Sequence, residues 1–248
     1  KKIVFEKDIT LYKADCLEVM PLLQNQVLIS SMDPPFGITA SQWDKIIPFS
    51  KMWEEIRRVR KDNAPTALFG SERSAAFTLG NLAEFKYDWV WEKSKASNFL
   101  LAKKQPLKAH ELISIFCNGR TPYYPIMEEG ELTGTARREE AIGQDKQCTQ
   151  SYIQHENKGT RYPRSVIYFK TAESEGKTIH VNQKPIALLE YHDKTYTKEG
   201  DTVLDFGFGE HEHAIACIYT NRKCICIEKD ETYFSQGEKR VRNEYQYL

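Results

Sequence analysis

The stretch Thr202-Val203-Leu204-Asp205-Phe206-Gly207-Phe208-Gly209 decides the fold class of this 248-residue chain. A β-branched run ends in an acidic and an aromatic residue, and a glycine-containing turn follows. Residues 213–220 are then helix-like, and the strand-like residues 223–228 end in Glu228. This order is typical of a half-fold that binds a nucleotide cofactor. Its glycines let the ligand approach the backbone, and the acid accepts ribose hydroxyls.

The rest of the chain alternates between short β-branched or aromatic runs and helix-like stretches. This alternation predicts an α/β fold, a mostly parallel twisted sheet with helices on both faces. The expected strands are residues 27–32, 66–70, 87–92, 111–116, 166–169, 202–206 and 223–228. The expected helices are residues 48–60, 72–82, 186–197, 213–220 and 231–243. Because ligands bind beyond the carboxyl ends of strands in such sheets, the residues after each strand are candidate site residues.

Residues 118–178 break this rhythm, because they are polar, contain scattered glycine and proline, and show no clear period before Val166. A loop this long is uncommon inside a compact domain, so we expect an inserted region. The predicted division is a first, catalytic half of the sheet domain at residues 1–117, an inserted region at 118–178 and a cofactor-binding half at 179–248.

The composition is that of an ordinary globular protein, with 40% hydrophobic and 28% charged residues. No apolar run reaches the roughly 18 residues that a membrane-spanning helix needs. The six cysteines form no Cys-x-x-Cys pair, and Cys224 and Cys226 alternate with isoleucines in a strand-like run. We therefore expect buried, reduced thiols and a cytoplasmic location.

The formal net charge is zero, with 35 basic and 35 acidic residues. This balance argues against a general electrostatic nucleic-acid binder, although a local basic face is enough to contact phosphates. One candidate face contains Lys93, Lys95, Lys103, Lys104 and Lys108, and a second contains Arg137, Arg138, Lys158, Arg161 and Arg164. On charge alone, a solvated surface is the favoured interpretation of both.

A second strand end with candidate functional residues follows residues 27–32 and reads Asp33-Pro34-Pro35-Phe36. The prolines fix φ and remove two N–H donors, so the loop is stiff and its carbonyls point in defined directions. A carboxylate and a neighbouring carbonyl can accept both hydrogens of an exocyclic amine, and Phe36 offers a stacking face for a planar base. The alternative is a tight turn in which Asp33 only caps local backbone. The four residues alone do not decide between these interpretations.

Taken together, these motifs resemble the amino-methylating DNA methyltransferases in which the catalytic motif precedes the cofactor motif. Further matches are Asp15-Cys16-Leu17, Gln183-Lys184-Pro185, the lead-in 199–206 and Ile227-Glu228. Gly37-Ile38-Thr39, Trp43-Asp44-Lys45 and Phe69-Gly70-Ser71-Glu72 are similar to the phage and prophage branch that methylates adenine. The resemblance covers nearly the whole chain and implies a Rossmann-like methyltransferase fold.

The resemblance also implies roles for individual residues. Asp33, Pro34, Pro35 and Phe36 would hold a flipped adenine for transfer of a methyl group from S-adenosylmethionine to its N6 amine. The implied cofactor-binding residues are Asp15, Cys16, Lys184, Asp205, Phe206, Gly207, Gly209 and Glu228. The inserted region would recognise a specific site in double-stranded DNA, and Lys93, Lys95, Lys103, Lys104, Arg137, Arg138, Arg161 and Arg164 are the candidate DNA contacts. Some related enzymes are homodimers, and nothing in the sequence decides the oligomeric state.

One loop departs from the family pattern. The family usually reads Gly-Ser-Gly-Thr-Thr-Gly where this chain has Gly209-Glu210-His211-Glu212-His213-Ala214. Small residues there leave room for the cofactor and expose N–H groups at a helix start. Added carboxylates facing the pocket would repel the carboxylate of the cofactor, and imidazoles would fill its space. The loop therefore motivates an alternative, a non-catalytic DNA-binding protein that kept the fold.

The same loop raises the question of a metal site, because histidines and carboxylates at short spacing suit zinc. Residues two apart lie roughly 200° apart on a helix, and a helix start is expected here. The sequence offers no certain third ligand, so it predicts no metal. A further alternative is cytosine-N4 methylation, since the same geometry serves any exocyclic amine. Adenine is favoured because enzymes that act on cytosine more often have serine at the position of Asp33.

Overall fold

The computed structural model describes residues 1–23, 27, 29–32, 47–70, 80–130, 159–174, 183–207, 209 and 211–246. The chain forms two compact units. The first contains Lys1–Tyr124 and Ser165–Leu248, and the second contains Pro125–Arg164.

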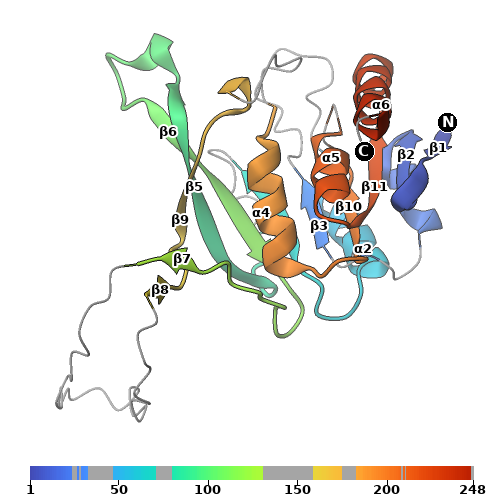
Figure 1. The fold of residues 1–248 in the computed structure, drawn as a ribbon, viewed down its shortest axis with the longest axis horizontal. Helices are drawn as coiled ribbons and strands as arrows, with labels where there is room; N and C mark the ends of the chain where they lie inside the picture. Colours follow the sequence, from blue (N-terminus) through green and yellow to red (C-terminus); the bar gives the residue numbers. More distant parts are fainter. Residues whose placement is uncertain are drawn as a thin grey trace. The chain divides into compact units, whose positions relative to one another are not determined.

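Among the described residues, nine strands of the first unit form one sheet (Figure 1). Its order is β1 (Lys2–Val4), β2 (Ile9–Lys13), β11 (Lys223–Glu228), β10 (Thr202–Asp205), β3 (Ile29–Met32), β4 (Thr66–Gly70), β6 (Lys108–Phe116), β5 (Phe85–Ser97) and β9 (Val166–Phe169). The strands from β2 to β4 are parallel, β1 and β6 are antiparallel to their neighbours, and β9 is parallel to β5. The prediction of a mostly parallel sheet is confirmed.

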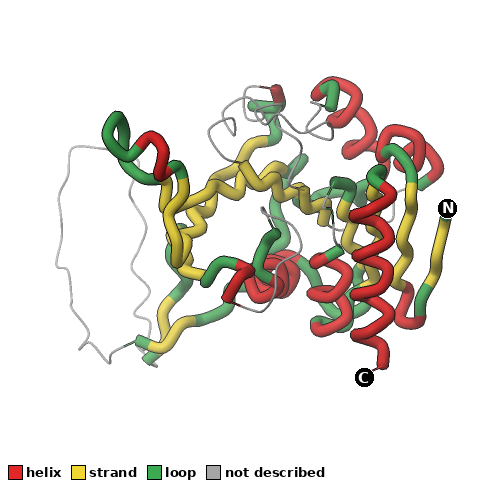
Figure 2. Tube along the Cα trace, turned by 90° about the horizontal axis from the view of Figure 1, so that it is seen from above, coloured by secondary structure: helices red, strands yellow, loops and turns green. Residues whose placement is uncertain are grey.

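Helices cover both faces of this sheet, as Figure 2 shows. One face is packed by α1 (Cys16–Val19) and α2 (Phe49–Val59), and the other by α4 (Ile186–Tyr196), α5 (Glu212–Tyr219) and α6 (Glu231–Gln246). Short 3-10 turns lie at Glu6–Asp8, Met20–Leu22, Phe99–Leu101 and Ala172–Ser174.

Alternate side chains along the strands belong to two separate hydrophobic cores. Val203 faces the core below α4, α5 and α6, whereas Leu204 faces the core below α1 and α2. In β11, Cys224 and Cys226 face the first core, and Ile225 and Ile227 face the second. This is the behaviour of a strand whose side chains point alternately to opposite faces. The expectation of buried, reduced thiols is confirmed for Cys16, Cys117, Cys217, Cys224 and Cys226, and Cys148 lies outside the described residues.

Several expected elements differ from the structure. The N-terminal strands β1 and β2 and the helix α1 were not predicted. The strand β5 is longer than the predicted residues 87–92, because it continues past a register shift into a hairpin with β6. Most of the helix expected at residues 72–82 lies outside the described residues, and residues 81–84 form a turn.

The second unit lies within the expected inserted region and is shorter at both ends. Its described part contains β7 (Glu128–Glu129) paired antiparallel with β8 (Thr160–Arg161). The predicted region 118–178 also includes β9, which pairs with β5 in the large sheet of the first unit.

Candidate active site

Four parallel strands end at one edge of the sheet. Asp205 at the end of β10 is in register with Cys226 of β11 on one side and with Ser31 of β3 on the other. Glu228, which ends β11, is in register with Lys13, which ends β2. The chain segments that follow β2, β3, β10 and β11 therefore all leave from this carboxyl edge, where ligands bind in open α/β sheets.

Asp15 lies at this edge, directly after β2. Its carboxylate caps α1 by accepting the Leu17 N–H at 2.9 Å and pairs with the Lys229 ammonium at 2.8 Å. Burial opposes ionisation, but the bonds from Lys229 and Leu17 lower the pKa of Asp15 below its usual value. Burial raises the pKa of the neighbouring Cys16 thiol to about 12, so Cys16 is an inert packing residue at neutral pH.

Glu228 joins the glycine loop to the end of β11. One of its carboxylate oxygens accepts the Gly209 N–H at 2.9 Å, and the other accepts the Asp230 N–H at 2.6 Å. Gly209 has φ of +54°, and a Cβ added there would meet no atom of the described residues beyond its chain neighbours within 4 Å. A glycine in the left-handed region thus leaves open space beside the carboxylate. Burial raises the pKa of Glu228 to about 7.

Asp205 and Phe206 are more deeply buried than Glu228. One Asp205 oxygen accepts the Gly207 N–H at 3.4 Å, and the other, Oδ2, is buried without a hydrogen bond from any described residue. Burial raises the pKa of this carboxyl well above its usual value. Phe206 packs into the core on the α1 and α2 side, so its ring acts in the fold rather than in ligand contact.

The unusual residues of the cofactor loop are directed into the protein. The Glu212 carboxylate pairs with Arg240 of α6 at 2.8 Å. The His211 ring, held at the start of α5 with φ of +56°, packs edge-on against Phe234 of α6. The His213 ring nitrogen Nε2 lies 2.8 Å from an oxygen of Asp193 on α4. Each of these side chains therefore has a partner on another helix, whereas Glu210 lies outside the described residues.

Lys184, expected from the resemblance to help hold the cofactor, is almost fully buried. Its ammonium lies 3.3 Å from a Glu111 oxygen and over the Phe69 ring at 5.6 Å from the centroid. Lys93 binds the other Glu111 oxygen at 2.8 Å. Burial opposes ionisation of Glu111, but Lys184 and Lys93 lower its pKa to about 2. Sequence reasoning missed Glu111, because nothing near it in the chain marks it as the partner of Lys184.

The expected DNA contacts fall in different settings. Lys93 is half-buried against Glu111, and Lys95 is exposed but pairs with Glu173 at 2.7 Å. Lys103 and Lys104 are exposed in the turn between β5 and β6. Arg161 and Arg164 are exposed on the second unit, and Arg137 and Arg138 lie outside the described residues. The motif Asp33-Pro34-Pro35-Phe36 also lies outside them, and β3 ends at Met32, the residue before it.

None of the described helices is long and apolar enough to cross a membrane.

The chain is 22% identical to the type II methyltransferase M.HinfI of Haemophilus influenzae, over 94% of this chain and 68% of that protein.

Two solved structures show the same fold. The PvuII DNA methyltransferase, which is cytosine-N4-specific, has a TM-score of 0.66 at 13% identity and covers 96% of this chain and 92% of its own. M1.HpyAVI, solved as a complex with SAM, has a TM-score of 0.62 at 20% identity and covers 93% and 98%. The family model described as DNA methylase, for N6 and N4 methyltransferases, matches residues 29–239. Because this match spans most of the sequence, the chain belongs to the N6/N4 DNA methylase family.

Proposed function

We propose that this methylase transfers a methyl group from S-adenosylmethionine to the N6 amine of an adenine flipped out of double-stranded DNA. One observation carries the proposal. The strand β3, which ends at the residue before Asp33, lies directly beside β10, which leads into Gly207 and Gly209. The amine-binding motif and the cofactor loop therefore start from neighbouring strands at one edge of the sheet.

The residues at the carboxyl edge fit the cofactor. The Glu228 carboxylate accepts the Gly209 and Asp230 N–H groups, and an ionised carboxylate has about four acceptor sites, so ribose hydroxyls can still bind. Gly209 leaves open space next to it. Asp15 stands across from Glu228 on the neighbouring strand end, because the Ala14 N–H donates to the Glu228 carbonyl at 3.1 Å. Asp15 is suited to the adenine of the cofactor.

The substituted loop does not oppose this fit at the positions that the structure describes. A Glu212 carboxylate paired with Arg240 adds no unpaired negative charge near the cofactor carboxylate. The His211 ring packs against Phe234 of α6, and the His213 ring lies between Asp193 of α4 and Asp205 at the end of β10. These contacts favour the catalytic interpretation over a cofactor-free DNA-binding protein.

The reaction needs a positioned amine more than a strong base. S-adenosylmethionine supplies an electrophilic methyl group when it is bound. The Asp33 carboxylate and the Pro34 carbonyl would accept the two amine hydrogens and orient the nitrogen lone pair, while Phe36 stacks on the base. The base must leave the duplex, at a cost of a few kcal/mol, because its amine is otherwise out of reach.

We assign DNA contact to the turn between β5 and β6, residues 98–107, in addition to the region 118–178. Figure 1 shows this hairpin turn projecting from the body of the first unit. Phe99 and Leu100 are exposed there, and Lys103 and Lys104 flank them. Lysines bind phosphates, and exposed apolar side chains contact bases or sugars. The DNA substrate places the enzyme in the cytoplasm of a bacterium or a phage-infected cell.

The proposal is tested by incubating the protein with duplex DNA and S-adenosylmethionine, digesting the DNA and identifying the modified nucleoside by mass spectrometry. N6-methyladenine is expected from the wild type and none from Asp33→Ala. The matched control is Asp62→Ala, an exposed turn aspartate, which should methylate like the wild type. Circular dichroism checks that both variants fold.

The other outcomes identify the rivals. N4-methylcytosine would overturn the adenine assignment and favour the specificity of the similar PvuII enzyme. DNA binding without any methylated nucleoside, combined with no cofactor binding, would show a non-catalytic protein. Methylation by Asp33→Ala would remove Asp33 from the site.

The hairpin contact is tested with the double variant Lys103→Ala/Lys104→Ala. Loss of two phosphate contacts should make the slope of log affinity against log salt less steep by about 2 for duplex DNA. The control is Lys61→Ala, an exposed lysine outside the candidate DNA contacts, which should leave the slope unchanged. An unchanged slope in the double variant would remove the hairpin turn from the DNA surface.

A further inference from the structure

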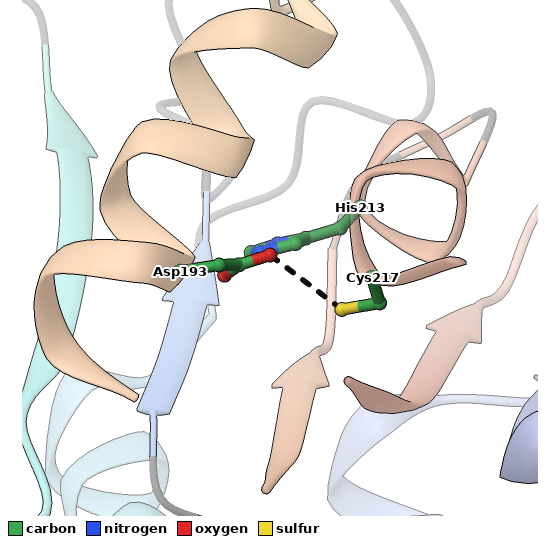
Figure 3. Close-up of side chains that lie close together, drawn as sticks. All are labelled: Asp193, His213 and Cys217. Carbon is green, nitrogen blue, oxygen red and sulfur yellow. Dashed lines mark hydrogen bonds and ion pairs between the residues drawn. The ribbon is translucent and has the colours of Figure 1, made fainter. Parts of the chain in front are cut away.

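Three metal-binding side chains meet in the core between α4 and α5. Asp193 comes from α4, and His213 and Cys217 lie four residues apart on α5, so they share one face of that helix (Figure 3). The His213 Nε2 lies 2.8 Å from Asp193 Oδ1, and the Cys217 thiol donates to Asp193 Oδ2 at 3.6 Å. All three residues are 0% exposed.

We propose that Asp193, His213 and Cys217 bind one divalent transition-metal ion of the zinc class. The proposal does not depend on the proposed methylation, because none of the three donors is assigned to cofactor or base, although His213 borders one such residue, Asp205. It also differs from the expectation of no metal that the sequence supported.

The donor set and its spacing suit such an ion. Zinc prefers nitrogen, oxygen and thiolate donors in tetrahedral geometry, with bonds of about 2.0–2.3 Å that set donors roughly 3.3–3.8 Å apart. The three ligand atoms lie within 4.8 Å of one another. A small rotation of Asp193 away from His213 therefore opens the centre for an ion.

The cluster can take up a divalent ion without a change in its net charge. Binding breaks the Cys217 S–H bond and displaces the proton between His213 Nε2 and Asp193, metal–sulfur and metal–nitrogen bonds form, and both protons leave to solvent. The thiolate and the Asp193 carboxylate then neutralise the two positive charges of the ion. A neutral cluster is less costly to bury than separate charges, which are expensive in a core unless paired.

A fourth residue lies beside the other ring nitrogen of His213. Asp205 Oδ2, which has no hydrogen bond from any described residue, lies 3.9 Å from His213 Nδ1, too far for a hydrogen bond. A small movement of the ring toward Asp205 would let Nδ1 donate to this carboxyl group and leave the Nε2 lone pair for the ion. Carboxylate, histidine and metal in a row are a common arrangement in zinc proteins.

The positions of the donors in the chain explain why the sequence of residues 209–214 did not predict a metal site. Neither His211 nor Glu212 joins the cluster, because His211 packs on Phe234 and Glu212 pairs with Arg240. The other two donors lie four residues later and on a different helix. A bound ion would tie the start of α5, and hence the end of the cofactor loop, to α4.

The test is a titration of chelator-treated full-length protein with Co²⁺, followed by absorption spectroscopy. The expected result is uptake of one equivalent, with a near-ultraviolet thiolate-to-cobalt band and visible bands of low coordination number, all displaced by Zn²⁺. In Cys217→Ser the thiolate band should disappear, and in His213→Gln the affinity should fall by at least about tenfold. Zn²⁺ should also raise the melting temperature of the wild type more than that of Cys217→Ser or His213→Gln.

The control is Cys117→Ser, a buried cysteine whose thiol donates to the Asn63 carbonyl far from the cluster in sequence; it should retain the wild-type spectrum. Wild-type protein that takes up no Co²⁺ would overturn the proposal, whatever the variants do. A thiolate band that persists in Cys217→Ser would overturn it as well. Circular dichroism of the metal-free variants distinguishes lost ligands from lost folding.

Discussion

The two faces of the sheet differ in what they bury. The face below α1 and α2 holds an apolar core, in which Phe116 packs between Trp53 and Phe85 at centroid distances of 4.7 and 5.8 Å. The face below α4 and α5 adds buried polar residues to its apolar core, namely His192, Asp193, His211, Glu212 and His213. Because buried polar groups are costly unless paired, stability on the second face depends on partners as well as on packing.

The position of these polar residues is informative. All of them lie on α4 and at the start of α5, the helices next to the cofactor loop. The first face therefore supplies stability, whereas the second combines stability with groups that can bind an ion or a proton. Substitutions on one face at a time separate these two contributions.

The largest effect is expected from Phe116→Ala on the apolar face. Phe116 is fully buried, so its loss removes apolar burial and leaves a cavity, at a cost of about 4 kcal/mol in the free energy of unfolding. Urea denaturation measures this value. The matched control is Leu82→Ala, whose side chain is exposed, and which should change stability by less than about 0.5 kcal/mol. Equal effects of the two substitutions would show that this face is not a packed core.

A smaller loss is expected from Asp193→Leu on the polar face, measured with a chelator present. Burial lowers the pKa of His213, but the attraction of Asp193 outweighs it and raises the pKa above its usual value. Removing Asp193 leaves His213 buried without the Asp193 carboxylate and should lower the free energy of unfolding by about 3 kcal/mol.

The double variant Asp193→Leu/His213→Leu sharpens this prediction. Its free energy of unfolding should exceed that of the single variant, because no buried charge is left without a partner. Additive losses from the two substitutions would show that Asp193 and His213 do not interact.

The smallest effect at neutral pH is a gain from His192→Leu. Both ring nitrogens of His192 are buried without a hydrogen bond from a described residue, and the ring is surrounded by Trp89, Tyr191 and Tyr196. An apolar side chain of similar volume should raise the free energy of unfolding by about 1 kcal/mol. A clear loss of stability would show that the imidazole has a partner in this core.

The advantage of His192→Leu should grow in acid. Burial, with a smaller contribution from His213, lowers the pKa of His192 from 6.5 to about 3. Between these values the unfolded chain binds more protons than the folded one, so wild-type stability falls as the pH drops below about 6.5. Urea denaturation at pH 7, 6 and 5 should show a widening difference, and a constant difference would contradict the depressed pKa.

Local sequence signals predicted most strands of the sheet well. The bounds of β4, β9 and β11 match the predicted runs, because each is a continuous apolar or β-branched segment. β2 was missed although Ile9 and Leu11 alternate inward, because five residues give a weak period. The strand-edge rule placed Asp205 and Glu228 at the same edge, whereas Asp15 was expected only from the family resemblance, since β2 was not predicted.

The partners of the site residues could not be predicted from the sequence. Glu111 binds Lys184, Arg240 binds Glu212, and Asp193 binds His213, each from a separate element. Such long-range pairs depend on how helices and strands pack, which no local pattern encodes. Whether the histidines and carboxylates of the loop obstruct the cofactor therefore could not be decided from the sequence.

The most direct test of the central claim, that the carboxyl edge is a working cofactor pocket, is calorimetric titration with S-adenosylmethionine. The titration is best done at pH 8, where Glu228, with its pKa near 7, is ionised and can accept ribose hydroxyls. One molecule per chain should bind with micromolar affinity, and Glu228→Ala should weaken binding. No binding at millimolar cofactor would contradict the account and leave a methylase fold without its cofactor.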